Sequence, residues 1–296
     1  MLKRTLVFSS PVSLSLHRCQ LVVAYKEPSA EAPVTVPIED IGMVMVENQR
    51  VSITIPLLNY LAANGVQVVL ADARVMPSAL LQPFEGHSLQ GEILQVQMAC
   101  GEVLRKQLWK QVVEAKIRNQ AALLHRIGAD DQVLRPLYQN IRSGDADNRE
   151  GAAARLYFPL LFGADFTRRR EDDAGVNVLL NYGYAVLRAA VSHALVASGL
   201  YPGLGLFHHH RSNAFPLADD MMEPFRPFVD AAVYDLKQQN LLTLNKESKA
   251  ALIQVLYADA VYDKVTRPLS VGLSLTTASL VRCFRQKEKT LSLPAL

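Results

Sequence analysis

The stretch Pro77-Ser-Ala-Leu-Leu-Gln-Pro-Phe-Glu-Gly-His-Ser-Leu-Gln-Gly91 decides the fold class, because the sequence pattern changes across it. Short runs rich in Val, Leu and Ile precede it, and apolar residues at helical spacing follow it. Proline and glycine recur within it, so we expect a linker over residues 81–91. The sequence predicts an α+β protein, with a small β-sandwich-like domain over residues 1–80 and a larger all-α domain over residues 92–296.

The first part predicts strands interrupted by one helix. The expected strands are Arg4–Phe8, Cys19–Tyr25, Gly42–Val46 and Val66–Leu70. In the helix, Thr54 is the expected cap, Pro56 lies in the first turn and Gly65 follows the end. Small strands with one short helix are typical of a compact sandwich.

After the linker, apolar residues recur with the helical period. Val176–Ser198 shows this well, because Leu179, Tyr182, Val186 and Ala190 fall on one stripe. The other predicted helices are Glu102–Arg118, Gln132–Ser143, Arg149–Phe162, Asp220–Gln239, Lys246–Ala260 and Ser274–Arg285. For the tail, Lys287–Leu296, we expect a mobile end.

Composition narrows the class of protein. The 296 residues are 50% hydrophobic and 20% charged, enough for one large domain or two ordinary ones. Polar residues interrupt every apolar tract before the roughly 18 residues that span a membrane, so we expect no membrane segment. Three widely spaced cysteines predict reduced thiols in a cytoplasmic protein. The net charge of +3 is only a weak indication of a polyanionic partner.

Glu150 is the first candidate for chemistry, within Asp145-Ala-Asp-Asn-Arg-Glu-Gly-Ala-Ala-Ala-Arg155. Asp147 and Glu150 have the spacing of a capping box, and this structural interpretation is the more common one for such a stretch. However, residues 151–154 leave the helix surface beside Glu150 without large side chains, which favours the close approach of a large ligand.

Three histidines, His208, His209 and His210, follow the glycine-containing turn Gly203-Leu-Gly-Leu-Phe207. Histidines in such a row more often form a polar loop than a metal site, so a ligand interpretation needs acidic partners.

Asp219, Asp220 and Glu223 are the acidic candidates. Asp220 and Glu223 would point from one face of a helix near its N-terminus, where they could also be a capping pair. Capping does not explain three carboxylates within five residues without a lysine nearby in the sequence, since such groups repel unless they share a proton or a cation. Oxygen ligands with one histidine suit Mg²⁺ or Mn²⁺, and the histidine favours Mn²⁺.

The same segments resemble a known family. The matching motifs are Ile55-Pro-Leu-Leu-Asn-Tyr-Leu-Ala-Ala-Asn-Gly65, Arg149-Glu-Gly-Ala-Ala-Ala-Arg-Leu-Tyr-Phe158, Val176-Asn-Val-Leu-Leu-Asn-Tyr-Gly-Tyr184 and Leu217-Ala-Asp-Asp-Met-Met-Glu-Pro-Phe-Arg-Pro227. In this order they are similar to the Cas-one family of CRISPR-associated endonucleases and integrases, in the form found beside type II effector nucleases. Several motifs in one order are more specific than any one of them.

The resemblance implies a prokaryotic integrase that inserts short foreign DNA segments (spacers) into the CRISPR array. It implies Mg²⁺ or Mn²⁺ held by the catalytic residues Glu150, His208 and Glu223, with Asp220 as a supporting acid. His208 is matched by its position after Gly-Leu-Phe, and a shift of register would select His209 or His210 instead. The implied partners are DNA, a second copy of the chain, a small second adaptation subunit and the type II effector nuclease. The N-terminal domain would supply the dimer and subunit contacts.

Candidate DNA contacts are Lys106, Lys110, Arg155, Tyr157 and Arg211. The arginines at 168–170 are further candidates, and for every one of these basic residues a solvated surface charge is the more common interpretation. Tyr157 at helical spacing is more often a core residue than a stacking platform. Gly183 predicts close helix packing.

Two other functions fit the same residues. One is a stand-alone metal-dependent nuclease that acts on branched or single-stranded DNA, which only the absence of joined products would distinguish. The other is a non-enzymatic DNA-binding scaffold in which Glu150 and Glu223 merely cap helices. In that case, Glu150→Ala would cost about 1 kcal/mol of stability and no activity.

Overall fold

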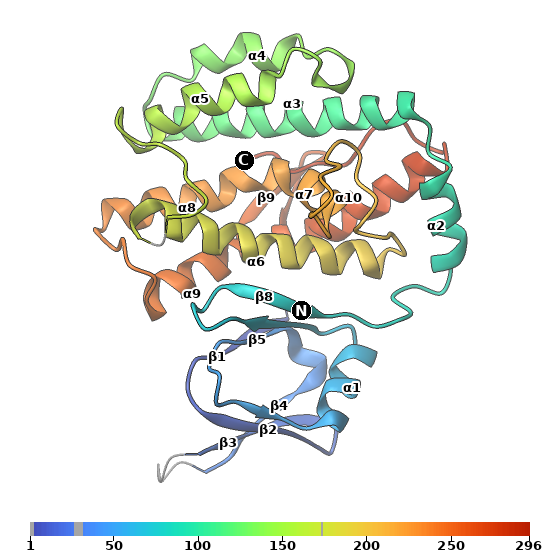
Figure 1. The fold of residues 1–296 in the computed structure, drawn as a ribbon, viewed down its shortest axis with the longest axis vertical. Helices are drawn as coiled ribbons and strands as arrows, with labels where there is room; N and C mark the ends of the chain where they lie inside the picture. The colour runs from blue at the N-terminus through green and yellow to red at the C-terminus, as the bar shows by residue number, and fades with distance from the viewer. Residues whose placement is uncertain (1–2, 27–31, 173) are drawn as a thin grey trace. The chain divides into compact units, whose positions relative to one another are not determined.

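The computed structural model describes residues 3–26, 32–172 and 174–296. Its internal contacts divide the chain into two units, Met1–Ser88 and Leu89–Leu296, which we describe separately. Strands dominate the first unit and helices the second, so the α+β prediction is confirmed (Figure 1). Within the described residues, no helix is both long enough and apolar enough to cross a membrane.

The first unit contains two four-stranded sheets. One has the order β1 (Arg4–Phe8), β5 (Ile41–Val46), β7 (Gln67–Ala71), β8 (Pro77–Leu81). The other has the order β4 (Val34–Pro37), β3 (Gln20–Tyr25), β2 (Val12–His17), β6 (Ser52–Ile53). Neighbouring strands are parallel in the pairs β1–β5, β5–β7 and β2–β6, and antiparallel in the others. The sequence prediction missed β2, β4, β6 and β8, which are short or alternate with serine.

The two sheets bury one shared apolar core. Leu14 and Leu21 from one sheet and Val44 and Val68 from the other are fully buried in the same cluster. The helix α1 (Ile55–Ala63) adds its buried leucines to that cluster. It begins after Thr54 and ends before Gly65, whose φ of 65° is readily adopted only by glycine, so the predicted helix limits are confirmed.

The second unit is mainly helical. Its α-helices are α2 (Gln90–Met98), α3 (Glu102–Arg126), α4 (Arg135–Gln139), α5 (Arg149–Phe162), α6 (Gly175–Ala197), α7 (Pro216–Met222), α8 (Arg226–Gln238), α9 (Lys246–Gln254) and α10 (Leu269–Phe284). The predicted helix Asp220–Gln239 is instead α7, the 3₁₀ turn η4 (Glu223–Phe225) and α8. Pro224 and Pro227 lack the N–H groups that an uninterrupted α-helix would use there.

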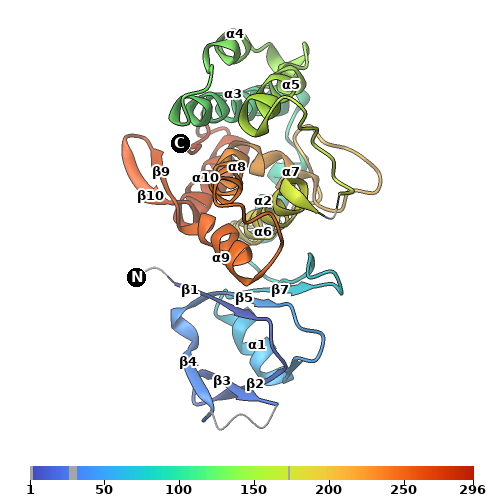
Figure 2. The same ribbon diagram turned by 90° about the vertical axis from the view of Figure 1, so that its left-hand side faces the viewer.

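An antiparallel hairpin shows that the prediction of an all-α second domain is wrong. β9 (Asp259–Tyr262) pairs with β10 (Val265–Pro268), and both contact α10 (Figure 2). The tail is also attached: Ala295 and Val261 exchange backbone hydrogen bonds of 2.9 Å. The expectation of a mobile tail is therefore wrong as well. The docked tail depends on a partner distant in the sequence, whereas the two strands of the hairpin are joined by a short turn.

The packing of α3 and α6 positions the site. The segment from α7 through η4 to α8 contacts both of these long helices (Figure 1). A Cβ at Gly183 of α6 would lie 2.4 Å from Val229 Cγ1 of α8, which confirms close packing at this glycine. Glu223 of η4 is thereby brought opposite α3, and α5 also packs along α3.

Candidate active site

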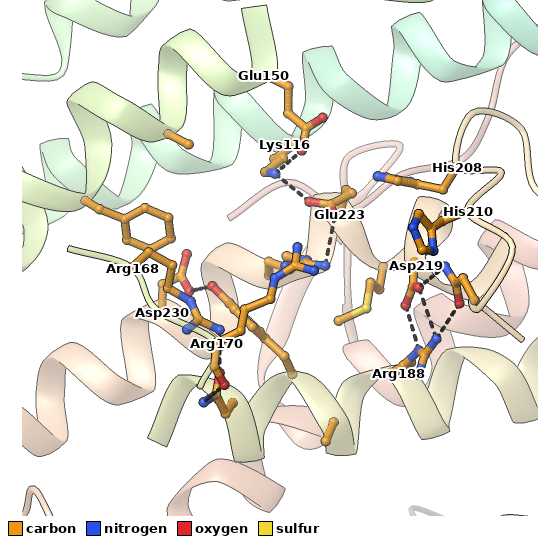
Figure 3. A pocket seen from close by; sticks show the side chains of 18 of the residues that line it. Lys116, Glu150, Arg168, Arg170, Arg188, His208, His210, Asp219, Glu223 and Asp230 are labelled. Atoms are coloured by element: carbon orange, nitrogen blue, oxygen red, sulfur yellow. Dashed lines mark hydrogen bonds and ion pairs between the residues drawn. The ribbon is translucent and has the colours of Figure 1, made fainter. Parts of the chain in front are cut away.

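A pocket of about 830 Å³ lies in the second unit, lined by residues of α3, α5, α6, η4 and the loop before α7. Figure 3 shows Glu150, Glu223 and His208 in one region of it. The remaining lining contains four arginines, Arg168, Arg170, Arg188 and Arg226, together with Asp219 and Asp230. Acids near several guanidinium groups suit a ligand that carries phosphates.

Other residues cap the N-terminus of α5, so Glu150 is not needed there and lines the pocket. The N-cap of α5 is Asn148, in the left-handed region at φ 50°, and its side chain accepts a hydrogen bond from Gly151 N at 3.1 Å. Asp145 accepts hydrogen bonds from Arg149 N at 2.7 Å and Glu150 N at 3.1 Å. The predicted capping box of Asp147 and Glu150 is therefore wrong. Glu150 has no role in the cap, and it lines the pocket instead.

Lys116 of α3 joins the two glutamates. Its Nζ lies 2.6 Å from Glu150 Oε1 and 2.5 Å from Glu223 Oε2, while Arg226 lies 2.9 Å from Glu223 Oε1. Burial alone would raise the pKa of Glu223, but Arg226 and Lys116 hold it below its usual value. Burial opposes the charge of Lys116 too, yet the two glutamates keep its pKa above the ordinary range. Lys116 and Glu223 are therefore both charged at neutral pH.

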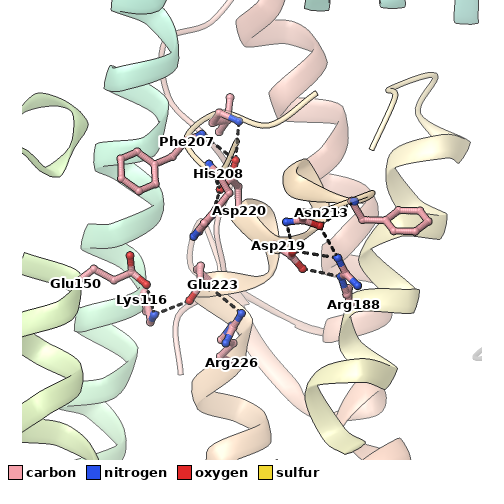
Figure 4. A network of polar contacts seen from close by, with 12 residues as sticks. Lys116, Glu150, Arg188, Phe207, His208, Asn213, Asp219, Asp220, Glu223 and Arg226 are labelled. Atoms are coloured by element: carbon pink, nitrogen blue, oxygen red, sulfur yellow. Dashed lines mark hydrogen bonds and ion pairs between the residues drawn. The ribbon is translucent and has the colours of Figure 1, made fainter. Parts of the chain in front are cut away.

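His208 is oriented by Asp220, which is fully buried in α7. Asp220 Oδ1 lies 2.5 Å from His208 Nδ1 (Figure 4). The same carboxylate accepts backbone hydrogen bonds from Leu206 at 2.6 Å, Phe207 at 3.0 Å and His208 at 3.3 Å. The loop thus wraps around one carboxylate, which engages Nδ1 and leaves Nε2 for another partner. The hydrogen bond to Asp220 raises the pKa of His208.

The neighbouring histidines are placed differently. His209 is exposed and does not line the pocket. His210 does line it, but its Nδ1 lies 2.8 Å from Ser212 Oγ. Phe207 stacks on Trp109 of α3 with ring centroids 4.6 Å apart, which fixes the loop immediately before His208. The loop geometry therefore favours His208 as the ligand.

Asp219, Asp220 and Glu223 do not need a metal ion to relieve charge repulsion in this structure, contrary to the prediction from the sequence. Asp219 pairs with Arg188 at 2.6 Å, Asp220 with His208, and Glu223 with Lys116 and Arg226. Among the described residues, no three His, Cys, Asp or Glu side chains are grouped closely enough to hold a metal ion. Lys116 separates the two glutamates that would do so.

The donor set nevertheless fits a divalent cation. Glu223 Oε2 is buried and, although close to Lys116, has no partner with hydrogen-bond geometry. Two carboxylates and an imidazole whose other nitrogen is held by a buried acid form a mixed O/N set of the kind that Mn²⁺ or Mg²⁺ accepts. Ala154, one turn after Glu150, lines the pocket with a small side chain and keeps this region open.

The predicted DNA contacts are not gathered at the pocket. Lys106, Lys110, Arg155 and Arg211 are at least partly exposed and do not line it, and Lys106 pairs with Glu102 at 2.6 Å. Tyr157 is fully buried and donates a 2.9 Å hydrogen bond to Asp230, so the core interpretation is correct and stacking on a base is not possible in this structure.

Three basic residues of the pocket, Lys116, Arg188 and Arg226, were not among the candidates from the sequence. Arg168, expected as a solvated charge, hydrogen bonds to Asn181 at 2.7 Å and lines the pocket. Lys116 had a usable signal, because it lies on the helical stripe of Trp109, Val113 and Gln120, which are all buried. A lysine on a buried stripe is rarely left without an acidic partner.

A buried tyrosine–aspartate network borders the pocket. Tyr157 and Tyr184 both donate to Asp230, and Tyr184 also packs under the Arg226 guanidinium, 4.7 Å from the ring centroid. Burial raises the pKa of Asp230 to about 6 despite the two hydroxyl donors. This network fixes the ring on which Arg226 rests.

Comparison with known proteins agrees with these features. The family model for CRISPR associated protein Cas1 matches residues 5–266. The chain is 42% identical over 258 residues to the CRISPR-associated endonuclease Cas1 of Neisseria meningitidis serogroup C, covering 86% of this chain and 83% of the relative. It is 26% identical over 281 residues to a Cas1 endonuclease of Francisella tularensis subsp. novicida, covering 87% and 86%.

Solved structures share the fold. A casposase bound to integration product superposes with a TM-score of 0.79 at 20% identity, covering 99% of this chain and 93% of that one. A Cas1 protein from Thermotoga maritima gives 0.76 at 16% identity, covering 95% and 97%. A chain of a partial Cas6-RT-Cas1–Cas2 complex gives 0.63 at 18% identity, covering 97% of each. With its family model, its relatives and its fold in agreement, the chain belongs to the Cas1 family, the Cas-one family whose motifs its sequence carries.

Proposed function

We propose that this protein is the integrase of CRISPR adaptation and that Glu150, His208 and Glu223 form its catalytic centre. The observation that carries the proposal is their convergence at one region of an arginine-lined pocket, in a chain 42% identical to a CRISPR-associated endonuclease Cas1. In the proposed reaction, the 3′-hydroxyl oxygen of an incoming DNA end bonds to phosphorus at the repeat boundary. The bond from that phosphorus to the bridging 3′-oxygen breaks, and this oxygen leaves as a new 3′-hydroxyl.

Glu150, His208 and Glu223 would hold Mg²⁺ or Mn²⁺. Such an ion, when bound, polarises a phosphoryl oxygen and stabilises both attacking and leaving oxygens. Asp220 would act as the supporting acid, holding His208 Nδ1 so that Nε2 faces the pocket. Arg226 and Arg168, which line the same pocket, would bind phosphate oxygens. With water in place of the hydroxyl, the same site would hydrolyse DNA.

We further propose DNA, a second copy of this chain and a Cas2-type subunit as partners, in a prokaryotic cytoplasm. The casposase of the same fold was solved with an integration product, and another chain of this fold with Cas2, which supports the first and third partners. Dimer and subunit contacts are proposed for the N-terminal domain, residues 1–80, whose described surface exposes Val34 and Ile55. Surface contacts to DNA are proposed for Lys106, Lys110, Arg155 and Arg211. The type II effector nuclease is proposed as a further partner on the sequence resemblance alone.

A strand-transfer assay tests the function. The purified protein, with and without the second adaptation subunit, is mixed with a short duplex bearing free 3′-hydroxyls and a supercoiled plasmid carrying the repeat, in Mn²⁺ or EDTA. We expect joined product only with the metal ion. His208→Ala and Glu223→Ala should abolish it, whereas the matched variant His209→Ala, changed at an exposed side chain outside the pocket, should retain it.

The other functions predict different products. Cleavage without joining, with the second subunit present, would identify a stand-alone nuclease. Failure of both cleavage and joining under either metal, with DNA binding intact, would identify a scaffold.

A further inference from the structure

We propose that Lys116 is a resident cation of the metal-free enzyme: its ammonium group neutralises Glu150 and Glu223 and gives up this position when a divalent ion binds. This inference rests on the proposed metal site. It assigns to Lys116 a positioning role in which the lysine sets both the geometry of the empty site and its affinity for the ion.

The position of the ammonium carries the inference. Lys116 Nζ contacts one oxygen of each glutamate, at 2.6 and 2.5 Å, and the side chain is almost fully buried. An ion bridging the same two carboxylates would use oxygens that the ammonium now engages. A divalent ion and an ammonium repel each other strongly at such short range in a partly buried site. The two cations therefore compete for one position.

The contact to Glu223 is suited to exchange. Its Oε2 lies 2.5 Å from the ammonium but makes no hydrogen bond of acceptable geometry, so the attraction is mainly electrostatic. A divalent ion supplies twice the charge at the same carboxylate. The other oxygen of Glu223 remains bound to Arg226 throughout, so the glutamate keeps its orientation during the exchange.

The structure also contains a second acceptor for the displaced ammonium. Gln120 lies one turn beyond Lys116 on α3, is buried, and lines the same pocket. Its Oε1 is buried without a hydrogen-bond partner, an arrangement that costs free energy. Since residues four apart on a helix are neighbours, a swing of the lysine side chain would bring its ammonium toward this oxygen. The unpartnered acceptor is an observation independent of the ion pairs.

Substitution of Lys116 should have two opposing effects, one on the stability of the metal-free protein and one on its affinity for Mn²⁺. In Lys116→Met the glutamates lose their shared counter-ion, so the metal-free protein should unfold at a lower temperature. The same loss removes the competitor, so Mn²⁺ should bind at least roughly tenfold more tightly, a factor of ten being 1.4 kcal/mol. Lys116→Arg keeps a competing charge and should bind Mn²⁺ no more tightly than the wild type.

The test is a titration of the full-length protein with Mn²⁺, in which free ion is measured by electron paramagnetic resonance. Fluorescence of the single tryptophan, Trp109, is a second readout, since its ring centroid lies 5.6 Å from that of His208. Lys246→Met, which makes the same change at an exposed position on α9, is the matched control. Glu223→Gln tests the metal site itself, and metal-free and Mn²⁺-loaded unfolding temperatures are recorded for every variant.

Tighter binding in Lys116→Met alone, with a larger Mn²⁺-induced rise in unfolding temperature, would support the inference. Binding that is equal to or weaker than wild type, with Glu223→Gln abolishing it, would overturn the role of Lys116 and leave the metal site intact. Absence of binding in wild type and Lys116→Met alike would overturn both proposals. If only Lys116→Met binds the ion, competition by the lysine is directly demonstrated.

Discussion

Asp220→Asn separates the two tasks of the most buried acid in the site. The wild-type carboxylate receives two backbone hydrogen bonds on Oδ2 and contacts His208 through Oδ1. Asparagine has nearly the same shape but only one acceptor oxygen. If that oxygen keeps the bonds to Leu206 and Phe207, the amide NH₂ must face His208 Nδ1.

The two consequences differ in size. Replacing charge-assisted hydrogen bonds by neutral ones, partly offset by no longer burying a charge, should lower the free energy of unfolding by about 2 kcal/mol. The amide would donate to Nδ1 and so place the imidazole proton on Nε2, the nitrogen that faces the pocket. Because that nitrogen must be unprotonated to bind an ion, Mn²⁺ affinity should fall by roughly 10- to 100-fold.

Urea unfolding of the metal-free protein and Mn²⁺ titration measure the two effects separately. Asp235→Asn, the same substitution at an exposed position of α8, is the control and should change neither quantity. If Asp220→Asn unfolds more easily but binds Mn²⁺ as the wild type does, the carboxylate only braces the loop, and the reasoning about the tautomer is refuted.

Three further predictions concern the surrounding structure. Burial raises the pKa of Asp230 to about 6. The stability that its protonated carboxyl group contributes is therefore complete below the unfolded pKa near 4 and is lost as pH rises through about 6. Relative to wild type, Asp230→Asn should gain up to roughly 3 kcal/mol in the free energy of unfolding between about pH 4 and 8, measured by urea unfolding at each pH. A flat difference would contradict this. Gly183→Ala should cost about 1–3 kcal/mol in the same assay, since the new methyl group overlaps Val229, and an unchanged midpoint would show that α6 and α8 can separate freely. Asn119→Ala, which removes hydrogen bonds to Pro224 O and to the tail, should lower the unfolding temperature and increase proteolysis of the last residues. An unaltered tail would mean that its other contacts, such as the pairing with β9 and the bond from Leu291 N to Gln111, hold it without Asn119.

Several elements followed from local sequence. Helix α1 begins after Thr54 and ends before Gly65 as predicted, and α5 has the predicted limits, because capping and proline or glycine geometry act within a few residues. Strand β1 also has its predicted limits. The candidate ligands Glu150, His208 and Glu223 were chosen from motifs in the sequence, and they remain proposals.

Contacts between residues distant in the sequence could not be predicted from local patterns. The tail is docked because Val261 meets Ala295, a contact that no local pattern encodes. The buried stripe of α3 indicates that Lys116 needs an acidic partner, but not that this partner is Glu150 and Glu223, which lie on separate elements. Hydrophobic periodicity determines which face of each helix is buried, because it acts over a few turns. Which buried faces meet, and so which charges neutralise one another, was decided only when α3, α5 and η4 packed together.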